Sequence, residues 1–492
     1  MSDVKTENIE EGNKKKSKFK FLYVVIAFCL IEVVIAGITC LNLVKLLPVK
    51  YMAILVAGLI VFNLLLLLSS KKIWTGIIMI ILACGLSAGM LYGIDVLNKV
   101  DEAITEITYD EEEEKQEEIT KMTILVLKDS DVHEVSDLKE FIISYVKDDD
   151  YEHVKKLMND IDKSLGGSVQ YKEFEKTTDM VDALYAKTVD ALIINEAHID
   201  IVMDFEGYET FPDDIKEVYS SQIVSYIEVV EKKETNLDCF VVYISGIDKF
   251  GYIGSKSRSD VNILAVVNTK THHIQLINTP RDYYIKHPNS KGKEDKLTHA
   301  GLYGINASKK ALEDLYGIEI DFYVKMNFSG FEAIIDSLGG IDVYSEYDFT
   351  VEPIKHYTVG MNHLTGLEAL AFARERYSFA AGDIQRGKNQ MEVIKATVNK
   401  MASSAILFRY EEVLDSLSWC FQTDMSKDDI YSLVRGQLAD LSGWTFDNYT
   451  VGGTGAFRTT YSTPHSEAWV MLPDEKDVEY VKTLINDALG KK

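Results

Sequence analysis

The sequence predicts an α/β protein with three transmembrane helices at its N-terminus, a small α/β domain and a larger α/β domain whose central sheet is flanked by helices. Three apolar runs, residues 19–41, 51–68 and 73–92, each approach the ~20 residues that a helix needs to cross a bilayer. Beyond them, short runs rich in branched residues, such as "MTILVLK" and "VNILAVV", alternate with helix-like stretches. This alternation is typical of α/β domains.

The lysines around the apolar runs predict the orientation of the chain in the membrane. Basic residues cluster before the first run and between the second and third, at Lys14, Lys15, Lys16, Lys18, Lys20, Lys71 and Lys72. Only Lys45 and Lys50 lie in the opposite loop. The positive-inside rule therefore predicts a multi-pass protein of the cell membrane, with residues 1–18 as a cytoplasmic tail and everything after residue 92 outside the cell.

The apolar segment holds few groups that could do chemistry. Glu32 lies within the first run, where a carboxylate is a functional candidate, but no ionisable residue deep in the other runs could pair with it. Helix packing, or protonation, is the simpler expectation. Only two of the five cysteines, Cys239 and Cys420, lie outside the runs, so one bridge between them stays open and a disulfide framework is excluded.

The external part divides into three by composition. Residues 93–120, with "DEEEEKQEE", are expected to form an acidic, solvated linker. Residues 121–233 predict an accessory α/β domain, with "MTILVLK" and "VDALIIN" as buried strands and "SDLKEFIISYV" as a helix opened by Ser136. No catalytic constellation stands out in it. Residues 236–490 predict the larger domain, with "VNILAVV" and "HIQLIN" as a hairpin and "SGFEAIIDSLGG" as a helix that starts at Ser329.

Several functions are excluded by composition or by missing motifs. The net charge of −25 opposes binding to nucleic acid, which requires a basic face. The sequence contains no G-x-S-x-G, H-E-x-x-H or G-x-x-x-x-G-K-[ST] pattern. Serine-triad hydrolysis and zinc chemistry are therefore disfavoured.

Against this acidic background, "RERYSFAAGDIQRGKNQ" gathers four basic side chains. Thr365 and Glu368 have capping-box spacing and predict a helix that ends near Arg374. Beyond that end, Arg374 and Arg376 share one face of an extended segment. Both guanidinium groups could then bind one anion, or they could simply pair with surface carboxylates.

A second helix is predicted after Gly382, with Asp383 at or near its N-cap. Arg386 and Gln390 are four residues apart and lie on the same face of this helix. Because helix N-termini attract anions, an arginine and an amide at this point favour a phosphate-binding site. Asp383 itself is either a helix cap or part of that site.

Two more motifs point to the same chemistry. In "INTPRDYYI", Pro280 stops the strand, so Arg281 leaves the sheet at the edge where α/β proteins bind ligands. In "SGIDKF…SRSDVN", Asp248 and Asp260 lie at the mouths of two neighbouring strands, with Arg258 beside the second. One or two carboxylates, water and substrate phosphate are the usual shell of Mg²⁺, so these residues suit a magnesium-bridged diphosphate. Either aspartate could instead begin a turn.

From about Asn236 to the C-terminus the chain resembles the LytR-CpsA-Psr (LCP) family of cell-wall glycopolymer transferases. The matching pieces, in order, are "YISGID", "RSDVNILAVVNTKT", "INTPRDYYI", "DKLTHAGLYG", "LYGIEIDFYVKMNFSGFEAIIDSLGGIDVYSEYDF", "HLTGLEALAFARERYSFAAGDIQRGKNQ" and "VMLPDE". The resemblance implies transfer of a glycan phosphate (teichoic acid, or capsular or wall polysaccharide) from a polyprenyl pyrophosphate to a peptidoglycan hydroxyl.

The resemblance also implies roles for particular residues. Asp248 and Asp260 would hold Mg²⁺, with Mn²⁺ as an alternative. The pyrophosphate would be surrounded by Arg258, Arg281, Lys296, Arg374, Arg376, Arg386 and Gln390. Arg281, Asp383 and Arg386 are the expected catalytic groups, with Asp383 either orienting the arginines or accepting the proton of the acceptor. Expected partners are the lipid-linked glycan, peptidoglycan and membrane lipid, and proteins of wall or capsule assembly are further candidates.

Two other functions fit the same residues. With water as acceptor, the site would belong to a polyprenyl-pyrophosphate phosphatase. Without catalysis, the external domains would bind a wall lipid and the protein would act as a membrane regulator. The short cytoplasmic tail argues against direct gene regulation.

Overall fold

The structure is a computed structural model that describes residues 2–108, 115–147, 150–167, 169–203, 205, 207–228, 235–247, 253–403, 412–413, 416, 421–463 and 467–491. Two residues of the sequence-based predictions, Asp248 and Cys420, lie outside these ranges. The chain divides into two compact units. The first is Met1–Glu106 with Ser426–Ser442, and the second is Ile107–Met425 with Gly443–Lys492.

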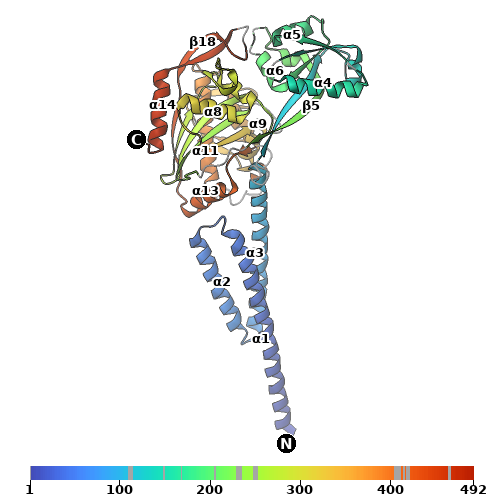
Figure 1. Ribbon diagram of the computed structural model, residues 1–492. Helices are drawn as coiled ribbons and strands as arrows, with labels where there is room; N and C mark the ends of the chain where they lie inside the picture. Colours follow the sequence, from blue (N-terminus) through green and yellow to red (C-terminus); the bar gives the residue numbers. More distant parts are fainter. Residues whose placement is uncertain are drawn as a thin grey trace. The chain divides into compact units, whose positions relative to one another are not determined.

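The first unit contains three long helices, α1 (Ser2–Leu43), α2 (Val49–Ser69) and α3 (Ile73–Ile107) (Figure 1). Three segments are long and apolar enough to cross a membrane, Lys20–Leu43, Val49–Ser69 and Ile73–Ile107, as the apolar runs predicted. Because α3 continues to Ile107, the predicted linker of residues 93–120 begins as helix.

Polar groups within the first unit join its helices. Glu32 of α1 is buried, and its Oε1 accepts a hydrogen bond of 2.8 Å from Ser87 Oγ of α3, so this carboxylate contributes to helix packing. The unit also contains α13 (Lys427–Ala439), whose Tyr431 hydroxyl donates to Asp101 of α3. The sequence assigned residues 427–439 to the larger α/β domain and gave no sign of this contact.

The second unit contains a five-stranded sheet of order β3-β2-β4-β1-β5. Its strands are β1 (Lys115–Leu127), β2 (Ile142–Val146), β3 (Gln170–Phe174), β4 (Ala191–Asn195) and β5 (Ile215–Glu228). Its helices are α4 (Tyr151–Leu165), α5 (Thr177–Tyr185), α6 (Glu196–Val202) and α7 (Phe211–Asp214). Buried clusters around Ile193 and around Leu192, neighbours that point to opposite faces of β4, make this sheet the centre of a two-sided core.

Two predictions about this part of the chain are wrong. The stretch "SDLKEFIISYV" is not one helix: a short 3₁₀ helix, η1 (Val135–Glu140), leads into β2, which pairs in parallel with β3 and β4. Tertiary pairing of the branched residues overrides the helical pattern. The end of the predicted linker is also a strand, because Lys115 already pairs with Glu228 of β5.

The larger sheet has six strands in the order β16-β11-β6-β7-β8-β17. They are β6 (Cys239–Ile247), β7 (Ser259–Asn268), β8 (His273–Asn278), β11 (Phe322–Asn327), β16 (Phe421–Thr423) and β17 (Thr445–Thr450). β7 and β8 form the predicted antiparallel hairpin, and β6 runs antiparallel to β7. Cys239 is a free thiol.

Helices and small ribbons complete the larger domain. The helices are α8 (Ile305–Tyr316), α9 (Phe328–Ser337), α10 (Gly366–Arg374), α11 (Asp383–Met401) and α14 (Glu475–Ala488), with short turns η2 (Pro288–Ser290) and η3 (Leu297–Tyr303). The ribbons pair β9 (Tyr284–Lys286) with β10 (Glu294–Lys296), β12 (Ile341–Ser345) with β15 (Gly360–Leu364), β13 (Phe349–Val351) with β14 (Lys355–Tyr357), and β18 (Gly453–Thr459) with β19 (Glu467–Pro473).

A main core joins the sheet to two helices, with Tyr243, Leu264 and Ile277 from the strands, Leu312 from α8 and Val481 from α14. A second core joins α9, α10 and α11 to the β12–β15 and β13–β14 ribbons.

The starts of α10 and α9 can be compared with the sequence-based predictions. The predicted capping box of α10 is confirmed, with Thr365 and Glu368 exchanging side-chain and backbone hydrogen bonds. The start predicted for α9 is wrong by two residues: Asn327, not Ser329, caps the helix and accepts from Gly330 N at 2.8 Å.

Candidate functional site: a buried cluster of arginines and aspartates

An arginine and an aspartate meet where β7 begins and β8 ends. Arg281 Nη1 donates a hydrogen bond of 2.9 Å to Asp260 Oδ1, and Thr298 Oγ1 donates to the same oxygen at 2.9 Å. The side chains of Arg281 and Asp260 are only 15% and 11% exposed. Antiparallel pairing of β7 with β8 brings them together, because the start of one strand lies beside the end of the other.

Electrostatics hold this pair in its charged form. Burial alone would raise the pKa of Asp260, but the guanidinium groups of Arg281 and Arg258 hold it well below its usual range. Asp260 in turn raises the pKa of Arg281 above its usual value. The pair is therefore a fixed ion pair at any physiological pH.

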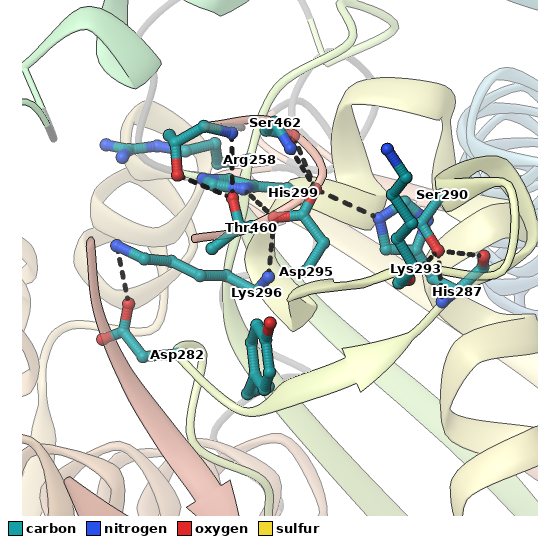
Figure 2. Close-up of polar contacts among 12 residues, drawn as sticks. Arg258, Asp282, His287, Ser290, Lys293, Asp295, Lys296, His299, Thr460 and Ser462 are labelled. Atoms are coloured by element: carbon teal, nitrogen blue, oxygen red, sulfur yellow. Dashed lines mark hydrogen bonds and ion pairs between the residues drawn. The ribbon is translucent and has the colours of Figure 1, made fainter. Parts of the chain in front are cut away.

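A second carboxylate, Asp282, connects Arg281 to a lysine. Arg281 Nε lies 3.6 Å from Asp282 Oδ2. Lys296 Nζ lies 3.4 Å from Asp282 Oδ1, as Figure 2 shows. The Nε atom of Arg281 is buried and makes no hydrogen bond within the described residues. Since a buried donor normally has an acceptor, this unsatisfied N–H marks Arg281 as a candidate functional residue.

The first turn of α11 adds a second arginine and aspartate. Gly382 precedes the helix with a φ of +50°, which glycine adopts readily. Arg386 Nη2 lies 2.5 Å from Asp383 Oδ1, an ion pair between largely buried side chains. Burial raises the pKa of Asp383 above its usual value and Asp282 adds to this effect, whereas Arg386 opposes it. Asp383 is therefore a stronger base than an ordinary surface carboxylate.

The structure also gives positions to the other predicted residues. Arg258 reaches α6, where its Nε lies 3.6 Å from Asp200 Oδ2. Arg376 acts electrostatically on both Asp383 and Arg386, so it lies near the cluster.

Arg374 and Gln390 have their own neighbours. The guanidinium of Arg374 stacks over Phe328, 4.4 Å from the ring centre, and so has a different neighbour from Arg376. Gln390 Nε2 donates to Ala373 O at 3.3 Å and joins α11 to the end of α10.

We use the name arginine cluster for Arg258, Arg281, Lys296 and Arg386 with the carboxylates Asp260, Asp282 and Asp383. Sequence reasoning missed several of the residues that hold it together. Asp282 directly follows Arg281, and Thr298 lies in the same motif as Lys296, so both were close to recognised positions. Asp295 was also missed. It is fully buried; its Oδ1 accepts from Lys296 N and from His299 Nδ1, both at 2.8 Å, and its Oδ2 accepts from Ser462 Oγ at 2.6 Å (Figure 2). This carboxylate fixes the backbone that carries Lys296 and Thr298.

Of the two predicted metal ligands, Asp248 and Asp260, the structure describes Asp260. Within the described residues, no group of three or more His, Cys, Asp and Glu side chains could hold a metal. Both hydrogen bonds of Asp260 use Oδ1, however, and Oδ2 accepts none within the described part of the chain. Ile247, which precedes Asp248, pairs with Ser259, which precedes Asp260. This arrangement fits a magnesium ion whose remaining ligands are phosphate and water.

Comparison with known proteins identifies the family. Residues 202–464, more than half of the chain, match the model of the LytR_cpsA_psr family. The chain belongs to this family. In this LytR_cpsA_psr protein the matched residues include every member of the arginine cluster. Asp200, which contacts Arg258, lies just before them.

Two curated relatives of the chain are named as teichoic acid transferases. The polyisoprenyl-teichoic acid–peptidoglycan teichoic acid transferase TagU of Bacillus cereus is 33% identical over 195 residues, which cover 39% of this chain and 63% of the relative. TagT of Bacillus subtilis is 31% identical over 239 residues, covering 45% and 73%.

Two solved structures are also similar. They are Bacillus subtilis TagV (24% identity, TM-score 0.44, 52% of this chain and 100% of that one) and TagT bound to LI-WTA (26%, 0.43, 52% and 94%).

Proposed function

We propose that this protein is a membrane-held phosphotransferase that moves a glycopolymer from a polyprenyl-pyrophosphate carrier to a hydroxyl of peptidoglycan. The observation that carries the proposal is the convergence of Arg281, Arg386 and Lys296 on one sheet edge, with a buried Nε of Arg281 that has no acceptor within the described residues. The names of TagU and TagT support the same activity.

The chemistry suits these side chains. Phosphoryl transfer needs in-line positioning and stabilisation of charge on the phosphate oxygens more than it needs covalent help. We assign the diphosphate oxygens to Arg281, Arg386 and Lys296, with Arg258 and Arg376 adding positive potential. Arg374 and Gln390 position the α10–α11 connection in this scheme.

The step is a displacement at the phosphorus that carries the glycan. The acceptor oxygen forms a new P–O bond, the bond from this phosphorus to the bridging oxygen breaks, and polyprenyl monophosphate leaves. Asp383 accepts the hydroxyl proton, because its raised pKa makes it the best base among the cluster's carboxylates. The product is a phosphodiester between glycopolymer and peptidoglycan.

Asp260, together with Asp248, would hold Mg²⁺ or Mn²⁺ through carboxylate oxygens. When bound, the ion would neutralise charge on the diphosphate and favour departure of the leaving group. The protein residues named above position the donor and accept the proton.

In the cell, we place the tail of residues 1–18 in the cytoplasm and the second unit outside, where peptidoglycan lies. This placement rests on the lysine distribution around the three apolar segments. The α1–α3 helices would keep the enzyme beside its lipid-linked donor.

The deciding experiment is a transfer assay with the full-length protein in lipid nanodiscs. A lipid-linked glycan is incubated with and without soluble peptidoglycan fragments, and release of polyprenyl phosphate and attachment of glycan are both measured. Transferase activity requires attachment and faster release when acceptor is present. Equal release without acceptor indicates a phosphatase, and binding of the lipid without release indicates a regulator.

A further inference from the structure

The second unit contains a cleft of about 710 Å³ that no part of the proposed mechanism uses. One wall comes from the five-stranded-sheet domain, with Asp150, His153, Lys176 and His198, and the other comes from the larger domain, with Lys256, Lys291, Tyr303 and Tyr461. We call it the inter-sheet cleft. Its volume falls in the roughly 300–1,000 Å³ range of ligand pockets.

Backbone hydrogen bonds and an apolar cluster join the two walls. Ile119 N of β1 donates to Gly254 O at 3.0 Å, and Lys256 N donates to Ile119 O at 3.0 Å, which adds a short parallel bridge between the two domains. In addition, Ile201 and Phe205 of the five-stranded-sheet domain pack against Leu302 of the larger domain in one buried cluster. The cleft is therefore bounded by backbone pairing and by an apolar contact.

Three lysines and two carboxylates line the inter-sheet cleft, and this small excess of positive charge favours an anionic ligand. Lys176 lines the cleft and has no ion-pair partner within the described residues. Two carboxylates, Asp150 and Glu175, lie on the same wall as Lys176. Asp150 is already flanked by His153 Nδ1 at 3.3 Å and His198 Nε2 at 3.6 Å and accepts from Asn195 Nδ2 at 2.8 Å. Of the other two lysines, Lys256 lies 3.1 Å from Glu118 Oε2, and Lys291 lies over the ring of Tyr461 at 5.7 Å.

The remaining lining suits sugar rings. Tyr303, Tyr461 and Phe205 provide aromatic surface, and Thr177, Thr178 and Asn289 provide hydroxyl and amide groups between them. Aromatic faces with a few oriented polar groups are the usual lining of a pocket for an amphipathic ligand. A saccharide has such a character, with apolar C–H faces and a rim of hydroxyls.

The cleft lies next to the arginine cluster. Ser462 lines it and donates to Asp295, which accepts from the backbone of Lys296. Figure 2 shows Ser462, Asp295, Lys296 and Arg258 in one neighbourhood. On the other wall, Arg258 contacts Asp200, which lies between the lining residues His198 and Ile201.

We propose that the inter-sheet cleft binds an anionic saccharide chain and aligns it with the arginine cluster during transfer. This inference rests on the proposed function and adds to it a substrate-binding role for the five-stranded-sheet domain. The anionic groups are either phosphates of the donor polymer or peptide carboxylates of the acceptor strand, and the same chemistry recognises both.

Binding of defined probes to the full-length protein in nanodiscs tests the inference by calorimetry. The probes are a glycerol-phosphate oligomer, a disaccharide–peptide released from peptidoglycan and an uncharged chitotetraose. We expect at least one anionic probe to bind more tightly than chitotetraose, with an affinity that falls as salt rises. The anionic probe that binds identifies the source.

Variants connect the binding to the cleft. Lys176→Ala should weaken binding about tenfold, since a lost charge-assisted hydrogen bond costs about that much, and Lys176→Arg should recover most of it. Lys163→Ala, at the exposed end of α4 and outside the cleft, is the matched control and should bind as wild type does. Thermal unfolding of each variant shows that it is folded.

The inference is overturned if no anionic probe binds, if chitotetraose binds equally well, or if Lys176→Ala binds as tightly as wild type. The transfer assay on the same preparation separates the two ideas. Intact transfer with failed binding removes only the cleft's role, whereas binding without any transfer removes only the proposed activity.

Discussion

Replacing Arg281 by alanine should separate the structural role of the arginine cluster from its chemical role. Arg281 donates at 2.9 Å to Asp260, and both side chains are largely buried. Removing one member of a buried ion pair costs about 3–5 kcal/mol, because the other charge stays buried without its partner. Arg258 still faces Asp260, so the lower end of this range, about 3 kcal/mol, is the expected loss of stability.

Transfer should fall more than stability explains. Loss of one preorganised donor to developing negative charge typically lowers the rate by ~10²–10³. A second variant, Arg281→Ala with Asp260→Asn, removes the stranded charge and should recover most of the lost stability but none of the transfer. Arg458→Ala, an exposed arginine of β18, is the matched control and should change neither quantity.

Two measurements check this prediction: thermal unfolding by tryptophan fluorescence, and attachment of labelled glycan to peptidoglycan fragments below the unfolding temperature of each variant. The reasoning is refuted if folded Arg281→Ala transfers within about threefold of wild type, far from the ~10²–10³ loss expected. It is also refuted if the double variant transfers as well as wild type, because Arg281 would then serve only to neutralise Asp260.

Three further predictions concern Asp383, the metal ion and Lys325, a buried lysine of β11. Asp383→Asn should lower kcat and abolish the acid limb of the pH–rate profile, because only the deprotonated Asp383 accepts a proton. In wild type this limb should lie above the usual carboxylate range, because burial raises the pKa of Asp383. Chelation with EDTA should abolish transfer while leaving the unfolding temperature nearly unchanged, and added Mg²⁺ should restore it. Burial lowers the pKa of Lys325 to about 8, so the folded chain binds fewer protons than the unfolded chain between pH 8 and 10.5. The free energy of unfolding should therefore rise with pH across that window, by about 3 kcal/mol at most. Lys325→Met should remove this slope, which melting at several pH values would measure.

Features set by local sequence were the ones that could be predicted. The three apolar helices follow from length and hydropathy, and the capping box of α10 follows from two residues three positions apart. The strand Ile142–Val146 could not be read in this way, because its pairing with β3 and β4 depends on residues far along the chain. The helical pattern of "SDLKEFIISYV" was a local signal that distant partners overrode.

The candidate site shows the same division between local and distant information. Arg281, Lys296 and Arg386 were recognisable as cations in suitable motifs, but the carboxylates that hold them were not. Asp282 joins Arg281 to Lys296, and this relation exists only after β9 and β10 have paired. Sequence therefore predicted candidate anion-binding groups, while the structure identified the carboxylates that contact them.

The balance of charge in the cluster explains how an acidic protein can keep several buried cations at one point. Arg281 faces Asp260, Arg386 faces Asp383 and Lys296 faces Asp282, so each cation has its own carboxylate. A diphosphate that enters this balanced site adds negative charge beside Asp383. That charge raises the pKa of Asp383 further, since a nearby anion disfavours the ionised carboxylate. In the proposed mechanism, donor binding would thus strengthen Asp383 as a base and favour activation of the acceptor hydroxyl when a donor is present.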